Sequence, residues 1–197
     1  MTKSVEFWFD FGSPTAYLAW LQLPKIAAAR NAEIVWCPML LGGVHKATGN
    51  TPPGAVAAKG AYMGVDLARF AKRYGVTLNF NPHFPVNTLP LMRGAVAALH
   101  EGDDFFHRYV KTMYEAMWLA PRNLNEPAQI AAVLQEGGFD TDWFLARTSD
   151  QAIKDELIAR TERAVSKGAF GAPTFYVGDQ MFFGQDRLDF VDAALAE

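Results

Sequence analysis

The sequence predicts an α/β protein in which a βαβ unit and a ββα unit are separated by a long all-helical block. Three observations lead to this prediction. Short strand-like segments rich in aromatic and β-branched residues occur near both ends of the chain and not in its middle. The first two are joined by a stretch of helical periodicity, which favours parallel strands linked by a crossover helix. The last two are joined by Gly178-Asp179, a tight hairpin signal.

The N-terminal unit begins with a strand predicted from about Ser4 to Phe11, which alternates and is rich in aromatic residues. A helix is expected over Pro14–Arg30. Ser13 suits its N-cap, because a serine hydroxyl accepts from the free amides of the first turn. Proline suits the first helical position, where no amide hydrogen is needed. Glu33–Pro38 is predicted to be the second strand.

The middle of the chain is expected to be mainly helical. Leu41–Gly54 is predicted to be a loop from its Gly and Pro content, and Val76–Pro90 is broken by prolines and is expected to be irregular. Apolar periodicity predicts helices at Ala55–Tyr74, Leu91–Glu101, Asp104–Leu119, Pro127–Glu136, Asp142–Thr148 and Gln151–Lys167.

β structure returns only near the C-terminus. Ala172–Val177 and Gln180–Phe183 are predicted to form the two strands of a hairpin. A final helix is expected over Arg187–Ala196, with Asp186 as a good N-cap. The order of elements is therefore βαβ, a helical block, then ββα.

Composition argues against several classes of function. Half of the 197 residues are hydrophobic and a fifth are charged, as in ordinary soluble domains. A net charge of −3 gives no basic footprint for nucleic acid or an anionic membrane. No apolar run approaches the roughly 20 residues of a membrane helix. The N-terminus enters a strand directly, without a secretory signal, so a cytoplasmic protein is expected.

Cysteine and histidine usage predicts neither a disulfide nor a metal site. Cys37 is the only cysteine, so an internal disulfide and a CxxC pair are both impossible. Its position in a predicted strand favours an inert buried thiol. No metal-ligand spacing is found among the histidines, which are His45, His83, His100 and His107.

Two motifs resemble the thioredoxin fold with a helical insertion. Asp10-Phe-Gly-Ser13-Pro-Thr-Ala16-Tyr stands where thiol oxidoreductases of this fold carry CxxC, with Ser13 and Ala16 in place of the cysteines. Phe170-Gly-Ala-Pro-Thr174 resembles the segment that carries a cis-proline. With both motifs in order, essentially the whole chain resembles the 2-hydroxychromene-2-carboxylate isomerase family, whose relatives are the kappa-class glutathione transferases.

This resemblance implies a glutathione site built from three segments. Ser13 would hydrogen-bond the thiol of glutathione, and a helix N-terminus lowers the pKa of a thiol. The backbone of Ala172, ahead of Pro173, would pair with the cysteinyl part like an added strand. The γ-glutamyl end would meet the segment Phe183, Gly184, Gln185 and Asp186. The residues alone allow a second role for Asp186, that of a simple helix cap.

The resemblance also implies a pocket for an aromatic, carboxylate-bearing substrate. Lys46 matches a family lysine implicated in holding the substrate carboxylate. The further pocket candidates are Asn50, Tyr62, Phe84 and Asn87. Taken without the resemblance, these side chains suit solvent exposure, turns or helix packing equally well. For the aromatic residues of the helical block two roles are open: they form part of a core, or some of them line such a pocket.

The implied function is glutathione-dependent cis–trans isomerisation of 2-hydroxychromene-2-carboxylate or a related aromatic carboxylate. Two alternatives remain open, a kappa-like glutathione transferase or peroxidase and a thioredoxin-fold binding protein without catalysis. The predicted thioredoxin-like domain comprises residues 1–45 and 168–197, and the inserted helical domain comprises residues 46–167. A homodimer is expected from the resemblance.

Overall fold

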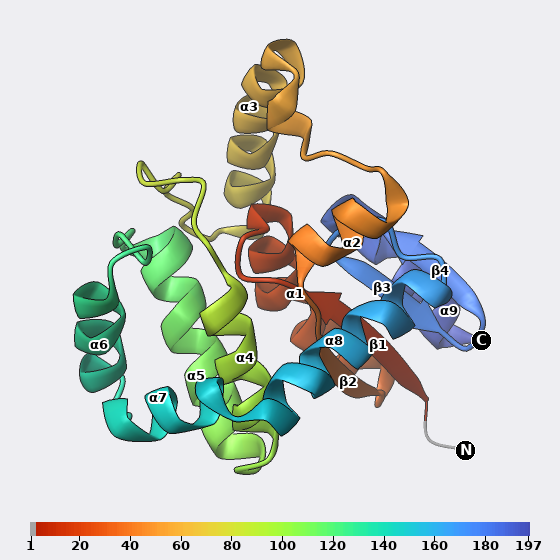
Figure 1. Cartoon of the computed structure of the whole chain (residues 1–197). Helices are drawn as coiled ribbons and strands as arrows, with labels where there is room; N and C mark the ends of the chain where they lie inside the picture. Colours follow the sequence, from red (N-terminus) through yellow and green to blue (C-terminus); the bar gives the residue numbers. More distant parts are fainter. Residues whose placement is uncertain (1–2) are drawn as a thin grey trace.

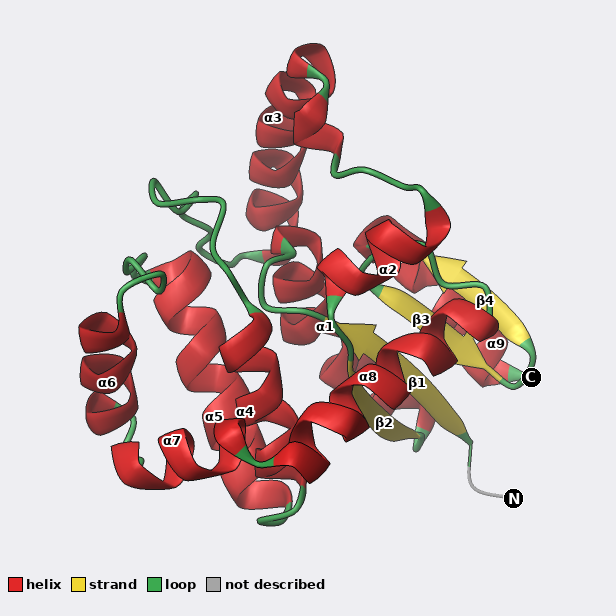
Figure 2. Cartoon of the chain, in the orientation of Figure 1, coloured by secondary structure: helices red, strands yellow, loops and turns green. Residues whose placement is uncertain are grey.

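The computed structural model describes residues 3–197 and contains a four-stranded sheet in the order β2-β1-β3-β4 (Figures 1 and 2). The strands are β1 (Ser4–Phe9), β2 (Glu33–Pro38), β3 (Thr174–Val177) and β4 (Gln180–Phe183). β1 is parallel to β2 and antiparallel to β3, and β3 is antiparallel to β4. The sheet therefore joins the two ends of the chain.

Helices α1 and α9 belong to the two terminal units, and α2 to α8 lie between β2 and β3. Their bounds are α1 (Pro14–Arg30), α2 (Leu41–Thr48), α3 (Ala57–Tyr74), α4 (Leu89–Leu99), α5 (Asp103–Tyr114), α6 (Pro127–Glu136), α7 (Thr141–Ser149), α8 (Gln151–Ser166) and α9 (Leu188–Ala196). Short turns are η1 (Pro53–Ala55), the π turn η2 (Glu115–Leu119) and η3 (Gln185–Arg187).

The sheet is covered on both faces. Alternate residues of a strand point to opposite faces, so Phe7 and Phe9 of β1 enter one core and Trp8 enters the other. The first core includes residues of α1 and α9, and the second includes Ala164 of α8. Figures 1 and 2 show α8 crossing one face of the sheet, with α1 and α9 on the opposite side. The arrangement leaves the carboxyl end of β1 beside the inserted helices.

Aromatic side chains extend the first core into the inserted helices. Phe11, just after β1, packs edge-to-face on Tyr109 and Tyr114 of α5, with ring centroids 6.1 and 5.0 Å away. Gly94 of α4 allows α5 to approach, because a Cβ there would lie 2.1 Å from the Tyr109 hydroxyl. The helical block and the sheet thus share one continuous hydrophobic core.

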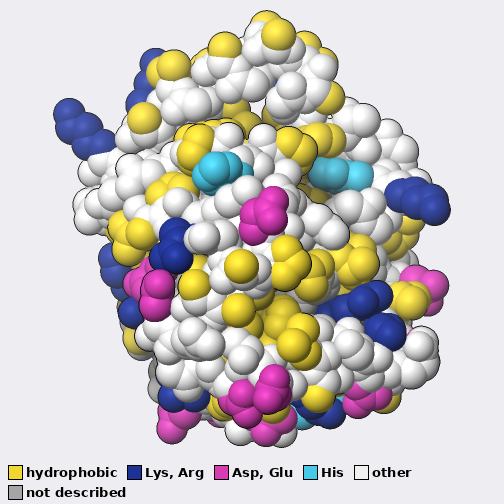
Figure 3. Space-filling view, turned by 60° about the vertical axis from the view of Figure 1, so that its left-hand side comes forward, with side chains coloured by type: hydrophobic (Ala, Val, Ile, Leu, Met, Phe, Trp, Pro, Cys, Tyr) yellow, Lys and Arg dark blue, Asp and Glu magenta, His cyan; other side chains and the backbone are white. Residues whose placement is uncertain are grey.

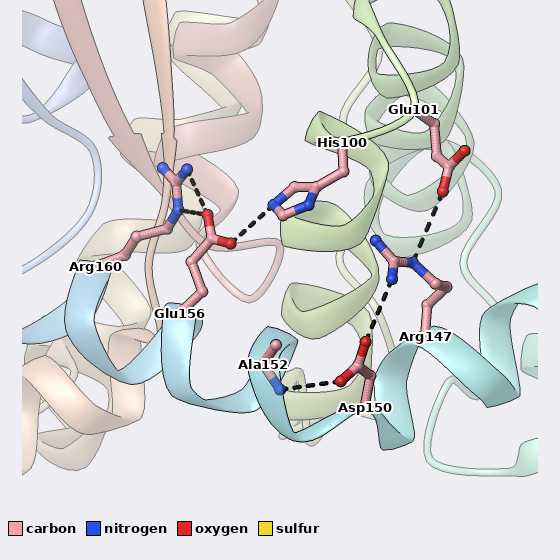
Figure 4. A network of polar contacts seen from close by, with 7 residues as sticks. All are labelled: His100, Glu101, Arg147, Asp150, Ala152, Glu156 and Arg160. Atoms are coloured by element: carbon pink, nitrogen blue, oxygen red, sulfur yellow. Dashed lines mark hydrogen bonds and ion pairs between the residues drawn. The ribbon is translucent and has the colours of Figure 1, made fainter.

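Polar contacts fix α8 to the end of α4 (Figure 4). Glu156 of α8 accepts from Arg160 one turn later and lies 2.8 Å from His100 Nε2 at the end of α4. Partial burial raises the pKa of Glu156, but hydrogen bonds from Arg160 and His100 lower it more, so it lies below its usual value. Arg147 of α7 pairs with Asp150, which caps α8.

Most predicted elements are confirmed. The bounds expected for α1, β2 and β4 are those observed, and Gly178-Asp179 forms the turn between β3 and β4. Ser13 is the N-cap of α1 and accepts from the Ala16 amide. Gly75 ends α3 in the left-handed region, at φ 66°. The order βαβ, helices, ββα is also observed.

The predicted loop over Leu41–Gly54 is wrong, because residues 41–48 form α2. Its Gly42-Gly43 pair suggests a loop, but tertiary contacts hold the helix. Val44 is buried, and Thr161 of α8 accepts from the amide of Leu40 at 3.0 Å. A Cβ at Gly43 would lie 3.0 Å from Thr161, so the glycine lets α2 approach α8 closely.

Two helix ends also differ from the prediction. The helix expected over Asp104–Leu119 ends at Tyr114 and continues as the π turn η2, since the amide of Ala120 bonds the carbonyl of Glu115. Asp186 is not the N-cap of the last helix. It lies within η3, and α9 begins at Leu188 with no side-chain cap.

Within residues 3–197, no helix combines the length and apolarity needed to cross a membrane. The division into residues 1–45 with 168–197 and residues 46–167 stays a prediction. Met1 and Thr2, which open the first of these ranges, lie outside the described residues.

Candidate functional site

Ser13 lies at the point where β1 gives way to α1, beside the segment that precedes β3. It is 4% exposed. Its Oγ lies 2.9 Å from the carbonyl oxygen of Ala172 and accepts from the Ala16 amide at 3.1 Å. The amide of Thr15 has no acceptor within residues 3–197. A serine hydroxyl and an unpaired amide thus share the positive end of α1, where an anion is favoured.

Thr15 offers a second hydroxyl to the same acceptor. Its Oγ1 lies 3.1 Å from the Ala172 carbonyl and 2.9 Å from Ser13 Oγ. The two hydroxyls together have two protons for these contacts. Thr15 can therefore bond the carbonyl while the proton of Ser13 turns to another acceptor. This arrangement lets Ser13 donate to an incoming anion without leaving the buried Ala172 carbonyl unpaired.

Pro173 follows Ala172 through a cis peptide bond, as the motif predicts. The carbonyl of Pro173 accepts from the Gly184 amide at 3.0 Å, which joins this segment to the end of β4. The amide of Ala172 has no acceptor in the described chain. One backbone donor beside Ser13 is consequently available for pairing, whereas the Ala172 carbonyl is already bonded.

Asp10 holds the loop that carries Ser13. Its carboxylate is fully buried and accepts from the amide of Gly12 at 2.8 Å, the amide of Leu41 at 2.8 Å and the hydroxyl of Thr88 at 3.1 Å. Burial raises the pKa of Asp10, and these three hydrogen bonds lower it, with burial the larger effect. One side chain thus links the starts of α1, α2 and α4.

The predicted γ-glutamyl segment lies next to Pro173 but is partly occupied by internal contacts. The Phe183 ring is 39% exposed and packs on Phe170 with centroids 4.4 Å apart. Gln185 is buried, and its Oε1 accepts from Tyr74 of α3 at 2.7 Å. Asp186 is exposed and pairs with Arg187 at 2.6 Å. Gln185 and Asp186 also border a pocket of about 350 Å³ between α1, α3 and α9.

An aromatic surface lies on the other side of the Ser13 loop. Trp118 of η2 donates from Nε1 to the carbonyl of Phe11 at 2.8 Å, two residues before Ser13. Phe80 and Phe84 pack on Trp118 with ring centroids 5.8 and 5.9 Å away. They are 51% and 41% exposed. The predicted candidate Phe84 is therefore connected to the Ser13 loop through one tryptophan.

Of the remaining substrate candidates, Asn50 contacts the segment before the cis-proline. Its Nδ2 donates to the carbonyl of Phe170 at 2.7 Å. Tyr62 is exposed on α3 and contacts Asp66. Asn87 accepts from the amide of Leu89 at the start of α4, which is a turn-forming contact.

Lys46 lies on α2 at the border of a different hollow, between α2, α4 and α8. Within residues 3–197 it has no ion-pair partner. Gly43 and Ala47 share its face of α2 and border the same hollow. Lys46 thus lies in the last turn of α2, and Asn50 follows the end of this helix.

The chain supplies no reactive sulfur at this site. Burial, helped by the nearby Glu6 carboxylate, raises the pKa of the Cys37 thiol to about 12. The thiol belongs to β2 and packs with Trp8 and Tyr176. No group of three or more His, Cys, Asp or Glu side chains suited to a metal ion is found in residues 3–197.

Three contributors were missed in the sequence. Thr15 follows Pro14 in the motif and has a hydroxyl, which was the available signal. Asp10 opens the motif, but its three partners come from segments that the sequence does not show to be neighbours. Trp118 is one of several aromatic residues of the helical block, and nothing in the sequence singles it out as a neighbour of Phe11.

Comparisons with known proteins identify relatives of this chain. The family model of the DsbA-like thioredoxin domain matches residues 4–196. The 2-hydroxychromene-2-carboxylate isomerase of Sphingobium xenophagum is 32% identical over 202 aligned positions that cover 100% of both chains. Human glutathione S-transferase kappa 1 is 27% identical, with 100% of this chain and 92% of the relative covered.

A solved structure of a 2-hydroxychromene-2-carboxylate isomerase superposes with a TM-score of 0.87 and 29% identity, covering 98% of this chain and 94% of the other. The four-stranded sheet and its inserted helices fit this match. The chain belongs to the DsbA-like thioredoxin-domain family and, within it, to the 2-hydroxychromene-2-carboxylate isomerase family.

Proposed function

We propose that the protein is a glutathione-dependent cis–trans isomerase of 2-hydroxychromene-2-carboxylate or a related aromatic carboxylate. The observation that carries the proposal is the Ser13 hydroxyl at the N-terminus of α1, with Thr15 able to replace it at the Ala172 carbonyl. Such a site suits a thiolate, and the chain has no cysteine of its own there. Glutathione would bring the missing sulfur.

The residues present fit glutathione in two respects. The unpaired amide of Ala172 lies just before β3, beside Ser13, and is suited to pair with a peptide carbonyl. Ser13 Oγ and the unpaired amide of Thr15 would hold the sulfur as a thiolate, the reactive form. The exposed Phe183 ring and the backbone of Gly184 to Asp186 would bound the γ-glutamyl end.

When bound, glutathione would supply a thiolate that adds reversibly to a conjugated carbon of the substrate. Once the chromene ring had opened, the former double bond could rotate as a single bond, and elimination would then restore the double bond and return the thiolate. The chain's part is to orient and stabilise the sulfur. Ser13 would donate to it while Thr15 keeps the Ala172 carbonyl bonded, so no buried acceptor loses its partner.

The exposed rings of Phe80 and Phe84 would form a wall for an aromatic substrate. Both rings pack on Trp118, which donates a hydrogen bond to the backbone of Phe11, two residues before Ser13. The same tryptophan therefore positions the aromatic wall and the loop that carries Ser13. We propose Lys46 as the partner of the substrate carboxylate, because its ammonium group has no competing carboxylate in the described chain. Asn50 and Asn87 would border the pocket, and Tyr62 would approach it from α3.

The test is Ser13→Ala, compared with Thr15→Val and followed by the ultraviolet spectrum of 2-hydroxychromene-2-carboxylate at saturating glutathione. Losing the hydrogen bond to the thiolate should lower kcat on the order of 10–100-fold or more. Thr15→Val should retain more activity than Ser13→Ala, because Ser13 then remains available but must choose between the thiolate and the Ala172 carbonyl. Unchanged isomerisation by Ser13→Ala would contradict the role of Ser13.

A second candidate is a kappa-like glutathione transferase or peroxidase, which the similarity to human glutathione S-transferase kappa 1 favours. Both activities would use the same sulfur site. They differ in stoichiometry, because an isomerase returns glutathione whereas a transferase or peroxidase consumes it. Net loss of glutathione with a halogenated aromatic compound or a hydroperoxide would support the second candidate.

The family membership also supports a homodimer in the cytoplasm. Sedimentation equilibrium of the purified chain should then give twice the mass of 21.8 kDa. A protein that neither binds immobilised glutathione nor isomerises the substrate would instead be a binding protein without this chemistry.

A further inference from the structure

A pocket of about 720 Å³ opens between α2, α4 and α8, outside the predicted site residues except Lys46. Apolar side chains from three helices and the segment before α2 form its walls, among them Leu40, Leu89, Leu157, Ile158 and Val165. Its volume falls in the range of small-molecule sites, which are mostly apolar with a few polar groups. The pocket is thus large enough for a ligand of two fused rings.

Three basic residues border this apolar pocket, namely Lys46, Arg93 and Lys154. Within residues 3–197, no carboxylate lies within 4.0 Å of the charged nitrogens of any of the three. The acidic member of the lining is Glu162, which is exposed. Figure 3 shows a face on which hydrophobic side chains gather in the middle with Lys and Arg side chains beside them.

Two other carboxylates near the start of α8 are engaged in ion pairs, and the exposed Asp155 accepts from Gln151 at 2.8 Å. Glu156 binds Arg160 and His100, and Asp150 binds Arg147 and the first turn of α8 (Figure 4). Lys154 lies between these two acids in sequence and pairs with neither. Its positive charge therefore stays uncompensated at the border of the pocket, although the residue is half-buried.

Arg93 carries the second observation that points to a ligand. Its Nε is buried and has no hydrogen-bond partner in the described chain. A buried donor without a partner is costly, and buried polar groups nearly always have one. Arg93 projects from α4 and borders the pocket, so an acceptor bound there could pair with its guanidinium.

From this combination we propose that the pocket binds a small hydrophobic carboxylate, with Arg93 and Lys154 holding the carboxylate and the leucine and isoleucine side chains enclosing its body. The apolar walls select a hydrocarbon or aromatic body, and the uncompensated cations select an anion. The proposal does not rest on glutathione chemistry, because Lys46 is the one residue of the proposed isomerase site that borders this pocket, and neither Ser13 nor the cis-proline segment does.

α2 separates this pocket from the Ser13 site. Gly43 and Ala47 lie on the face of α2 toward the pocket, whereas Val44 packs in the cluster that contains Ala172, next to Ser13. The two sites are therefore distinct, although α2 contributes to the surroundings of both. Occupation of the pocket would bear on α2 and its neighbours without covering Ser13.

The test is titration calorimetry of the full-length protein with 2-naphthoate, without glutathione. Arg93→Gln with Lys154→Gln should weaken binding about tenfold or more, since each replaces a charge-assisted hydrogen bond. Ile158 is 55% exposed, so Ile158→Glu and its isosteric control Ile158→Gln should both fold. Only the glutamate variant should repel the anion and weaken binding about tenfold or more.

The neutral 2-naphthamide should bind the wild-type protein at least tenfold more weakly than 2-naphthoate. Binding of decanoate would show that the apolar walls accept an aliphatic chain as well as an aromatic ring system, and the proposal includes both. Equal binding by Ile158→Glu and Ile158→Gln would overturn the proposal. So would binding that is lost in Phe84→Ala and kept in Arg93→Gln with Lys154→Gln, because the ligand would then occupy the Ser13 side. Absence of 2-naphthoate binding by the wild type would overturn it as well.

Discussion

At the scale of single residues, Ser13 and Thr15 share one acceptor, the carbonyl of Ala172. A lone N-cap serine would have to abandon a buried carbonyl in order to bind a ligand. Here the neighbouring threonine can keep that carbonyl bonded, so the proton of Ser13 is available at little cost. Asp10 fixes the position of both hydroxyls through the amide of Gly12.

Cys37 should be inert in the folded protein. Burial raises its pKa to about 12, so almost none of the thiol is ionised near neutral pH. Folded protein should therefore resist iodoacetamide at pH 8, whereas protein unfolded in urea should react at once, as followed by mass spectrometry. Cys37→Ala should also keep its activity. Rapid alkylation of folded protein at that pH would contradict the buried position.

At the scale of elements, close packing of helices decides how the inserted block meets the sheet. α2 and α8 approach at Gly43, and α4 and α5 approach at Gly94. Neither glycine has a positive φ. Both are therefore explained by their lack of a side chain, which lets the neighbouring helix approach closely. Of the two glycines at the start of α2, Gly43 is thus explained by helix packing, whereas nothing lies within 4 Å of the Cβ position of Gly42.

Gly94→Ala should destabilise the protein strongly. The new Cβ would lie 2.1 Å from the Tyr109 hydroxyl and 2.9 Å from the Phe144 ring, so overpacking should lower the free energy of unfolding by about 1–3 kcal/mol or more. Gly64→Ala on α3 is the matched control, since nothing lies within 4 Å of its Cβ position. It should be neutral or stabilising by about 1 kcal/mol at most. Urea denaturation measures both, and equal stabilities would contradict the packing of α4 on α5.

The contact between α4 and α8 should weaken in acid. The pKa of Glu156 is lower in the folded protein than its usual value of 4.5, so the unfolded chain takes up the proton first. The stabilisation by the Glu156 carboxylate is therefore fully present above about pH 4.5, and it is lost as the pH falls through the lower pKa of the folded protein. Glu156→Gln should be less stable than the wild type at pH 7, and the difference in unfolding free energy should shrink towards pH 3. A difference that is constant over this range would refute the ion pair.

At the scale of the whole molecule, the chain combines a DsbA-like thioredoxin domain with a proposed thiolate site that has no cysteine of its own. The order of elements along the chain and the inserted helices could be predicted because strand, turn and helix signals are local in sequence. α2 and the partners of Asp10 could not, because they depend on contacts such as Leu41 to Asp10 that join distant segments. Ser13 and Pro173 were found through their motifs, whereas Thr15 and Arg93 required the three-dimensional arrangement.

The central claim is that the site uses the sulfur of glutathione without consuming it. The most direct measurement follows the ultraviolet spectrum of 2-hydroxychromene-2-carboxylate with purified protein, with and without glutathione, while free thiol is titrated in parallel. The account predicts isomerisation that requires glutathione and leaves its concentration unchanged over many turnovers. Isomerisation at the same rate without glutathione would contradict it.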